Sequence, residues 1–172
     1  DEKDPFRTAL AARLVPAQSR LRVHHLGKAH DHEWAREAAR EMAQNPRYHW
    51  IGEVAKWRVR REFERTHLMV ISSNQEGGAN VVSEAIAAGV PIIASDIDGN
   101  VGLLGKGYRG YYPVGDERAL AALLWRGETD TRFLPSLQRQ CDKLRPLFTP
   151  ESESRALARV VKAASRAVTR SN

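Results

Sequence analysis

The chain has 172 residues, of which 42% are hydrophobic and 28% charged, and this fits one compact domain with its own core. No apolar run approaches the roughly 20 residues of a membrane span, and the single cysteine, Cys141, excludes an internal disulfide and favours a reducing cytoplasm. The net charge of +6 comes from scattered basic residues without interleaved aromatic residues, which disfavours nucleic-acid binding and leaves a membrane surface or phosphorylated small ligands as partners.

The spacing of apolar residues predicts helices and strands that alternate along the chain. In chain order we predict a helix between Asp4 and Pro16, a strand at Arg20–Leu26, a helix at Asp31–Asn45, a strand at Tyr48–Ile51, a helix at Val54–Arg65, a strand at His67–Ile71, a helix at Asn80–Gly89, a strand at Pro91–Ala94, a glycine-rich loop at Asp96–Gly105, a strand at Gly110–Val114, and helices that start at Asp116, Asp130 and Thr149. This alternation predicts the α/β class, with a doubly wound parallel sheet that has helices on both faces and several helices at the C-terminus.

The predicted series opens on a helix, with no strand before it. A series of strand–helix units is expected to begin with a strand and its loop. We therefore expect residues 1–172 to form a single Rossmann-like domain that lacks its first strand, and we expect a second α/β domain upstream. Within the opening helix, Leu10, Ala11 and Leu14 are predicted to lie on one apolar stripe, and Val59 and Phe63 are predicted core contacts of a later helix.

The stretch Glu76–Ser95 combines a strand exit, a glycine-bearing loop, a helix and a second buried strand. Gly77 and Gly78 let the backbone approach a ligand closely. Asn80 is a candidate cap for the helix, whose first N–H groups would then form an anion site. Helical spacing places Glu84 away from the face that carries the apolar residues. Two carboxylates therefore flank a loop suited to a phosphate.

The same stretch resembles the C-terminal half of GT-B glycosyltransferases of the retaining, family-4-like kind. Glu76 and Glu84 have seven residues between them, as in the signature of that family, and the run Asn80–Asp96 is close to the family form. The opening Glu2-Lys3-Asp4 is similar to the family's Glu-Lys-Gly, whose lysine contacts the donor diphosphate. The resemblance covers about residues 3 to 124.

The resemblance implies a UDP-sugar as donor substrate, with no cofactor and no metal. Glu76 would act at the catalytic centre, where it contacts hydroxyls of the donor sugar, and Glu84 would accept hydrogen bonds from the ribose hydroxyls. Phosphate oxygens would be held by backbone N–H groups and a lysine, and Val54 would lie beside the base. The donor-binding residues implied in this way are Lys3, Val54, Gly77, Gly78, Ala79, Asn80, Val81 and Glu84.

Each of these residues also has a structural interpretation that involves no ligand. Glu84 could be a solvated helix glutamate, and Glu76 a loop carboxylate that stabilises the N-terminus of the next helix. Lys3 could lie on the plain surface, and Val54 could be a core residue. The sequence leaves these alternatives open.

One branch of the family, the bacterial selenosugar synthases, is similar to this chain at Glu76–Glu84, Gly99–Gly105 and Gly110–Asp116. Enzymes of this branch join a UDP-sugar to selenophosphate. Gly102 and Leu103 stand where the family usually has a glutamate, and Gly78-Ala79 replaces the usual aromatic-glycine pair. The implied partners are a nucleotide-sugar, a small-molecule acceptor that is selenophosphate in this branch, and an upstream acceptor domain of the same protein.

Other functions compete with the donor domain of a glycosyltransferase. A GT-B-fold UDP-sugar epimerase would use the same donor, and a non-catalytic nucleotide-binding module could use the same phosphate loop. A Rossmann dehydrogenase is disfavoured because no Gly-x-Gly-x-x-Gly follows a strand. No group of histidine, cysteine and acidic residues has the spacing of metal ligands, and no serine triad is indicated.

Overall fold

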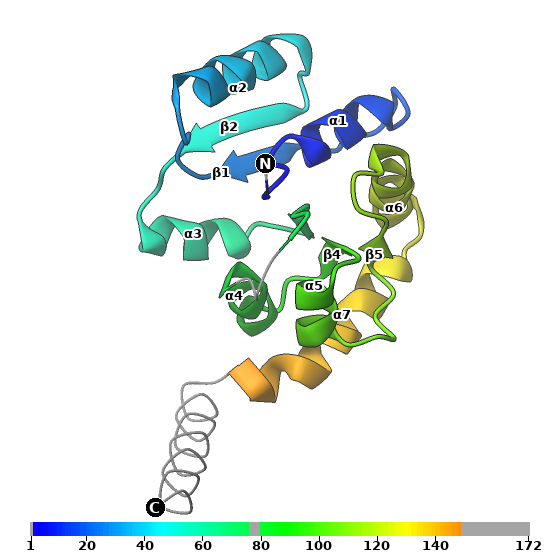
Figure 1. The fold of residues 1–172 in the computed structure, drawn as a ribbon. Coiled ribbons are helices and arrows are strands. Elements are labelled where there is room, and N and C mark those ends of the chain that lie inside the picture. The colour runs from blue at the N-terminus through cyan, green and yellow to red at the C-terminus, as the bar shows by residue number, and fades with distance from the viewer. Residues whose placement is uncertain (1, 76–79, 149–172) are drawn as a thin grey trace, which may run out of the picture.

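The computed structural model describes residues 2–75 and 80–148, in which helices and parallel strands alternate, so the predicted α/β class is confirmed. Figure 1 shows their arrangement. The strands are β1 (Val23–Leu26), β2 (Tyr48–Gly52), β3 (Met69–Ile71), β4 (Ile92–Ser95) and β5 (Tyr111–Tyr112). The helices are α1 (Arg7–Leu14), α2 (His32–Gln44), α3 (Lys56–Phe63), α4 (Asn80–Ala88), α5 (Asp98–Leu104), α6 (Glu117–Thr129) and α7 (Phe133–Leu144), followed by a 3-10 turn η1 (Arg145–Phe148).

The strands form two parallel sheets in the described residues, where we predicted one continuous sheet. β1 pairs with β2, and β4 lies between β3 and β5. The sheet is interrupted between β1 and β3, because neither strand has a ladder partner on that side in the part of the chain described. The burial of the strand residues reflects this interruption. Met69 and Val70 of β3 remain half-exposed, whereas all four residues of β4 are buried.

The two faces of the β1–β2 sheet are covered by different helices. His24 Nδ1 lies 3.7 Å from Glu62 Oε2 of α3, while the His25 ring lies 5.4 Å from Trp34 of α2. Because successive strand residues point to opposite faces, α2 and α3 cover opposite faces of this sheet, as Figure 1 also shows. The prediction of helices on both faces is confirmed for this sheet.

The buried ring of His25 gives a testable pH dependence. Its Nδ1 lies 2.7 Å from the Tyr48 hydroxyl, and burial lowers the pKa of His25 below its ordinary value. The folded state therefore binds fewer protons than the unfolded state below about pH 6.5. We expect the free energy of unfolding to decrease as the pH falls from 8 to 5.5, and we expect this slope to be flatter in His25→Gln. Urea denaturation of both proteins at a series of pH values measures the slopes, and equal slopes would contradict the prediction.

The main core lies between the β3–β4–β5 sheet and the helices α4, α6 and α7. α4 contributes Val82, Ala85 and Ile86, all fully buried, which confirms the predicted apolar face of this helix. Gly89 follows α4 with φ = +75°, a conformation that favours glycine at the end of a helix.

Two helices bury other residues than predicted. α1 contacts α6, and its fully buried residues are Ala9, Ala11 and Ala12, whereas Leu10 and Leu14 are 36% and 50% exposed. Small side chains allow a helix to approach its neighbours closely, so alanine rather than leucine forms the buried face of α1. No residue of α3 is fully buried; Val59 and Phe63 are half-exposed, and Phe63 packs against the core. The prediction was therefore right for Ala11 and for Phe63 as a core contact, and wrong for Leu10 and Leu14.

The segment predicted as a glycine-rich loop contains a helix, α5 (Asp98–Leu104). Its glycine and asparagine are weak helix formers. Burial of Leu104 in the core and of the Asn100 side chain overrides this local preference. Asp98 also places a negative charge in the first turn, which favours the helix.

The helices that follow differ from their predicted limits. α6 is capped by Asp116, where a helix was predicted to start, and it extends to Thr129. Asp130 ends α6 instead of starting α7, because its carboxylate accepts hydrogen bonds from Arg126 Nε and from Arg132 N. The last predicted helix, from Thr149, lies outside the described residues. Within those residues, no helix is long and apolar enough to cross a bilayer.

Candidate functional site

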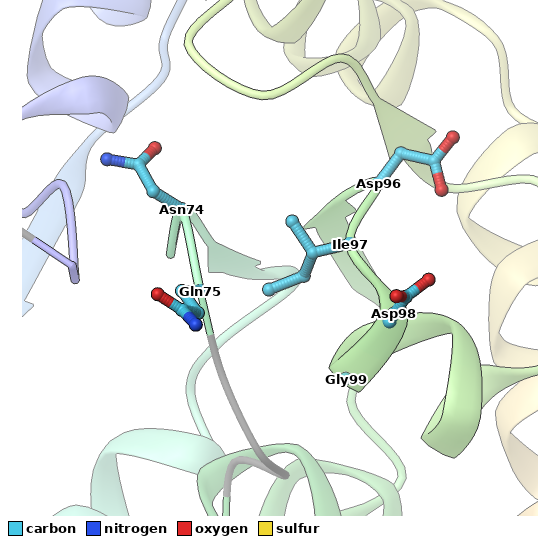
Figure 2. Close-up of a pocket in the computed structure, with 6 residues that line it drawn as sticks. All are labelled: Asn74, Gln75, Asp96, Ile97, Asp98 and Gly99. Atoms are coloured by element: carbon cyan, nitrogen blue, oxygen red, sulfur yellow. The ribbon is translucent and has the colours of Figure 1, made fainter.

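An open pocket of about 520 Å³ lies at the carboxyl ends of β3 and β4. It is lined by Asn74, Gln75, Asp96, Ile97, Asp98 and Gly99. Figure 2 shows the two amide residues on one side and the Asp96–Gly99 segment on the other. In open α/β sheets, ligands bind outside the carboxyl ends of the strands, where successive connections run in opposite directions. From β1 the chain continues to β2 on one side, and from β3 it continues through β4 to β5 on the other side. The pocket therefore borders the place where the direction of the connections reverses.

The side chains of the pocket differ in direction. In Figure 2 the Ile97 side chain points towards Asn74 and Gln75, while the carboxylates of Asp96 and Asp98 point the other way. The side of the pocket near Asn74 therefore presents neutral groups. No ion pair involving either aspartate is found in the described ranges, and no group of three potential metal ligands occurs there.

The N-terminal residues are held against the exit of β3. Asn74 N donates to Glu2 O at 2.7 Å, and Ser72 Oγ lies 2.9 Å from Asp4 O and 3.3 Å from Lys3 O. Lys3 is exposed. These bonds place Lys3 beside the segment that leads from β3 to α4, although the two are about 70 residues apart in the sequence.

The turn after Lys3 is reinforced by charged groups. Asp4 has φ = +43°, a conformation that is uncommon for a residue with a side chain. Its carboxylate accepts a hydrogen bond from Arg7 Nε at 2.7 Å, and Arg7 Nη1 donates to Glu117 Oε2 of α6 at 2.5 Å. The hydrogen bond with Asp4 raises the pKa of Arg7. The start of the chain is thus anchored to α6 as well as to β3.

On α4, two of the three candidate donor-binding residues lie on the side away from the core. Asn80 and Glu84 are exposed, one turn apart, and Val81 is half-buried against the core. Asn80 is the first residue of the helix, so it does not stand in the preceding cap position that we predicted. Glu84 is held on the outer face because Val82, Ala85 and Ile86 are buried.

The remaining predicted residues divide into two groups. Val54 is half-buried in the turn that follows β2, at the carboxyl end of the other sheet. Glu76, Gly77, Gly78 and Ala79 lie outside the described residues. The structure therefore brings Lys3 to the exit of β3 and places Asn80 and Glu84 on the exposed side of α4.

None of the residues that line the pocket was predicted as a donor-binding or catalytic residue. Asp96 and Asp98 were assigned to a glycine-rich loop, and no role was predicted for Asn74 and Gln75. Their position directly after two neighbouring buried strands was the available signal, because the carboxyl ends of parallel strands meet at one edge of a sheet.

A buried polar network lies beneath the pocket. Ser95, the last residue of β4, donates from Oγ to Ser73 O at 2.5 Å. Asn100 Nδ2 donates to Ser95 O at 2.9 Å and to Ser95 Oγ at 3.1 Å. The Tyr111 hydroxyl donates to Asn100 O at 3.2 Å. Burial and the nearby Asp96 raise the pKa of Tyr111 to about 12.

Comparison with known proteins points to one family. The family model described as "Glycosyl transferases group 1" matches residues 1–142. No curated protein matches the chain.

Many solved structures share its fold. HepE from Anabaena in complex with UDP-glucose is 18% identical with a TM-score of 0.82, and the match covers 94% of this chain and 46% of that one. Sucrose-phosphate synthase from Thermosynechococcus elongatus is 20% identical with a TM-score of 0.76, covering 97% and 44%. A glycosyltransferase from Rickettsia africae is 16% identical with a TM-score of 0.78, covering 95% and 45%. The chain thus spans a little under half the length of each of these structures.

Proposed function

The chain belongs to the group 1 glycosyltransferase family, and from this premise we propose that it is the donor-binding half of a retaining GT-B glycosyltransferase that uses a UDP-sugar. The observation that carries the proposal is the attachment of the Lys3 segment to the exit of β3. It brings a cation to the carboxyl edge of the sheet, from which the chain continues to α4 and its outward-facing Glu84. HepE, which has this fold, was crystallised with UDP-glucose, and this supports the choice of nucleotide.

The roles that we propose follow from the chemistry of the groups. Lys3 neutralises charge on the diphosphate, together with backbone N–H groups near the start of α4. Glu84 binds the ribose diol through its two carboxylate oxygens. Glu76 contacts hydroxyls of the donor sugar at the catalytic centre. Val54 lies beside the base. These groups stabilise the negative charge that develops on UDP as it leaves.

The proposed donor loop would use backbone groups as well as side chains. Gly77, Gly78 and Ala79 would allow phosphate oxygens to approach the main chain. Asn80 and Val81 would continue this contact into the first turn of α4, where the N–H groups of a helix favour an anion. Because Asn80 is exposed, a ligand can reach this turn without displacing a core residue.

We also propose that a parallel strand lies between β1 and β3 in the full-length protein and that an upstream α/β domain carries the acceptor. The unpaired sides of β1 and β3 in the described residues support the strand, as do the half-exposed Met69 and Val70. The hydrogen bond from Asn74 N to Glu2 O extends β3 pairing towards the same place. Because the chain covers less than half of each fold neighbour, a full-length protein of similar size would have room for a second domain.

For the acceptor we propose selenophosphate, on the basis of the branch-like segments Gly99–Gly105 and Gly110–Asp116. Gly102 and Leu103 replace the usual glutamate of the family, so neither position offers a carboxylate to a sugar. Both residues are in α5, and Leu103 packs against the core. An anionic acceptor would be attracted to the side near Lys3.

Two experiments test this function in the full-length protein. Isothermal titration calorimetry with UDP should show binding, and its absence for UDP and for UDP-sugars would reject the donor site. UDP release from UDP-glucose or UDP-N-acetylglucosamine should require selenophosphate. Turnover with an ordinary alcohol and none with selenophosphate would reject the acceptor. Epimerised sugar as the product would favour the epimerase, and binding without any turnover would favour the non-catalytic module.

A further inference from the structure

Three buried polar residues, Ser73, Ser95 and Asn100, support the floor of the pocket. Each is the immediate neighbour in sequence of a residue that lines the pocket. Ser73 follows β3, Ser95 ends β4, and Asn100 belongs to α5. The network therefore joins the three elements from which the described walls of the pocket extend.

The donors and acceptors of this network determine which atom of the Asn100 side-chain amide faces Ser95. Ser95 Oγ donates to Ser73 O, so its oxygen is left to accept from Asn100 Nδ2. The same Nδ2 donates to Ser95 O, which as a carbonyl can only accept. The amide nitrogen of Asn100 must therefore face Ser95. As a consequence Asn100 Oδ1 is buried without a hydrogen-bond partner among the described residues.

This arrangement is costly for a purely structural element. A buried acceptor without a partner costs about 1–3 kcal/mol. An apolar residue in place of Asn100 would avoid this cost, since the neighbouring strand β4 is buried along its whole length. A connected polar network instead restricts the distance and angle between the groups that it joins.

We propose that Ser95 and Asn100 are positioning residues, which hold the 72–75 and 96–99 segments at the separation that the UDP-sugar requires. Neither side chain contacts the substrate, because both are fully buried. They act through the backbone: Ser95 through Ser73 O, and Asn100 through both peptide and side-chain groups of Ser95. The inference rests on the proposed function, since the ligand whose binding it affects is the UDP-sugar.

Ser95→Ala is the principal test, because it removes the hydrogen bond from Ser95 Oγ to Ser73 O and leaves the volume nearly unchanged. In the full-length protein we expect UDP to bind between about threefold and a hundredfold more weakly, as for a displacement of about 1 Å in a binding site. Ser95→Thr retains the hydroxyl and should restore most of the affinity. Asn100→Asp is a second variant: it replaces the amide donor with an oxygen that repels Ser95 O, and it should show the same defect.

Tyr108→Phe is the matched control, because it removes a buried hydroxyl from the opposite end of β4. Tyr108 Oη accepts from Ile92 N at 3.1 Å and donates to Ile92 O at 2.5 Å. This variant should lose stability to a similar extent as Ser95→Ala but should bind UDP as the wild type does. If the two variants weaken UDP binding equally, or if Ser95→Ala leaves it unchanged, the positioning role is rejected.

Hydrogen–deuterium exchange provides a readout that needs no ligand. Ser95→Ala should exchange faster than wild type at the amides of residues 72–75 and 96–99, whereas Tyr108→Phe should not. Equal exchange at these amides in both variants would overturn the inference. If the wild type binds no UDP, the proposed function fails, and the exchange comparison still decides whether the network positions the pocket walls.

Discussion

Replacing Glu84 with alanine is expected to weaken UDP binding by about tenfold to a hundredfold, the largest effect of any single surface substitution that we predict. A carboxylate that accepts two hydrogen bonds from a ribose diol contributes charge-assisted bonds, each stronger than a neutral one. The stability of the protein should change little, because Glu84 is exposed on the outer face of α4 and no ion pair involving it is found in the described residues.

Glu37→Ala is the matched control for this substitution. Glu37 is also an exposed glutamate in the middle of a helix, α2, on the far side of the β1–β2 sheet. The Glu37→Ala substitution removes the same charge as Glu84→Ala and should leave UDP affinity unchanged. Calorimetric titration of both variants measures the difference. Undiminished UDP affinity in Glu84→Ala would remove Glu84 from the site and restore its interpretation as a solvated helix residue.

Gly110→Ala is expected to destabilise the protein by about 3 kcal/mol, the largest stability effect that we predict. A Cβ at this position would lie 2.5 Å from Ile92 O and 2.7 Å from Tyr108 Cε1. Ile92 begins the fully buried strand β4, and Tyr108 Oη bonds to the same peptide groups. Neither neighbour can move without disturbing the β4–β5 pairing, so the strain cannot be relieved at the surface.

Gly107→Ala, three residues earlier, is the control because a Cβ there would meet no atom within 4 Å. Urea denaturation should show a lower midpoint for Gly110→Ala with an unchanged slope, and nearly wild-type behaviour for Gly107→Ala. Equal midpoints for the two variants would show that the contact between Gly110 and β4 is not rigid. Because β4 also leads into the pocket, UDP affinity in Gly110→Ala should fall as the folded fraction falls.

Local signals predicted most of the individual elements well. Asp31 and Asp116 were predicted to cap helices, and each accepts hydrogen bonds from N–H groups of the first turn. The apolar face of α4 and the buried strand β4 were also predicted. In these places one residue or a short periodic run carries the structural information, so no distant part of the chain is needed to interpret it.

Predictions that depended on a packing partner were less accurate. Leu10 and Leu14 were expected to face the core, but the buried residues of α1 are alanines. The segment Asp98–Leu104 was predicted as a loop from its glycines and forms a helix. In both cases the outcome depends on the shape of a surface contributed by distant residues, and the local sequence does not specify that shape.

The sequence by itself determined the α/β class, the family resemblance and the outward direction of Glu84, because each depends on residues close together in the chain. Only the tertiary structure decided that Lys3 lies at the exit of β3, that Asn74 and Asp96 border one pocket, and that Ser95 and Asn100 support it. It also decided that β1 and β3 leave the sheet interrupted in the described residues. These features arise where segments far apart in the sequence meet, and most of the hydrogen bonds that join them end on backbone carbonyls, which every residue carries. Composition therefore does not reveal them.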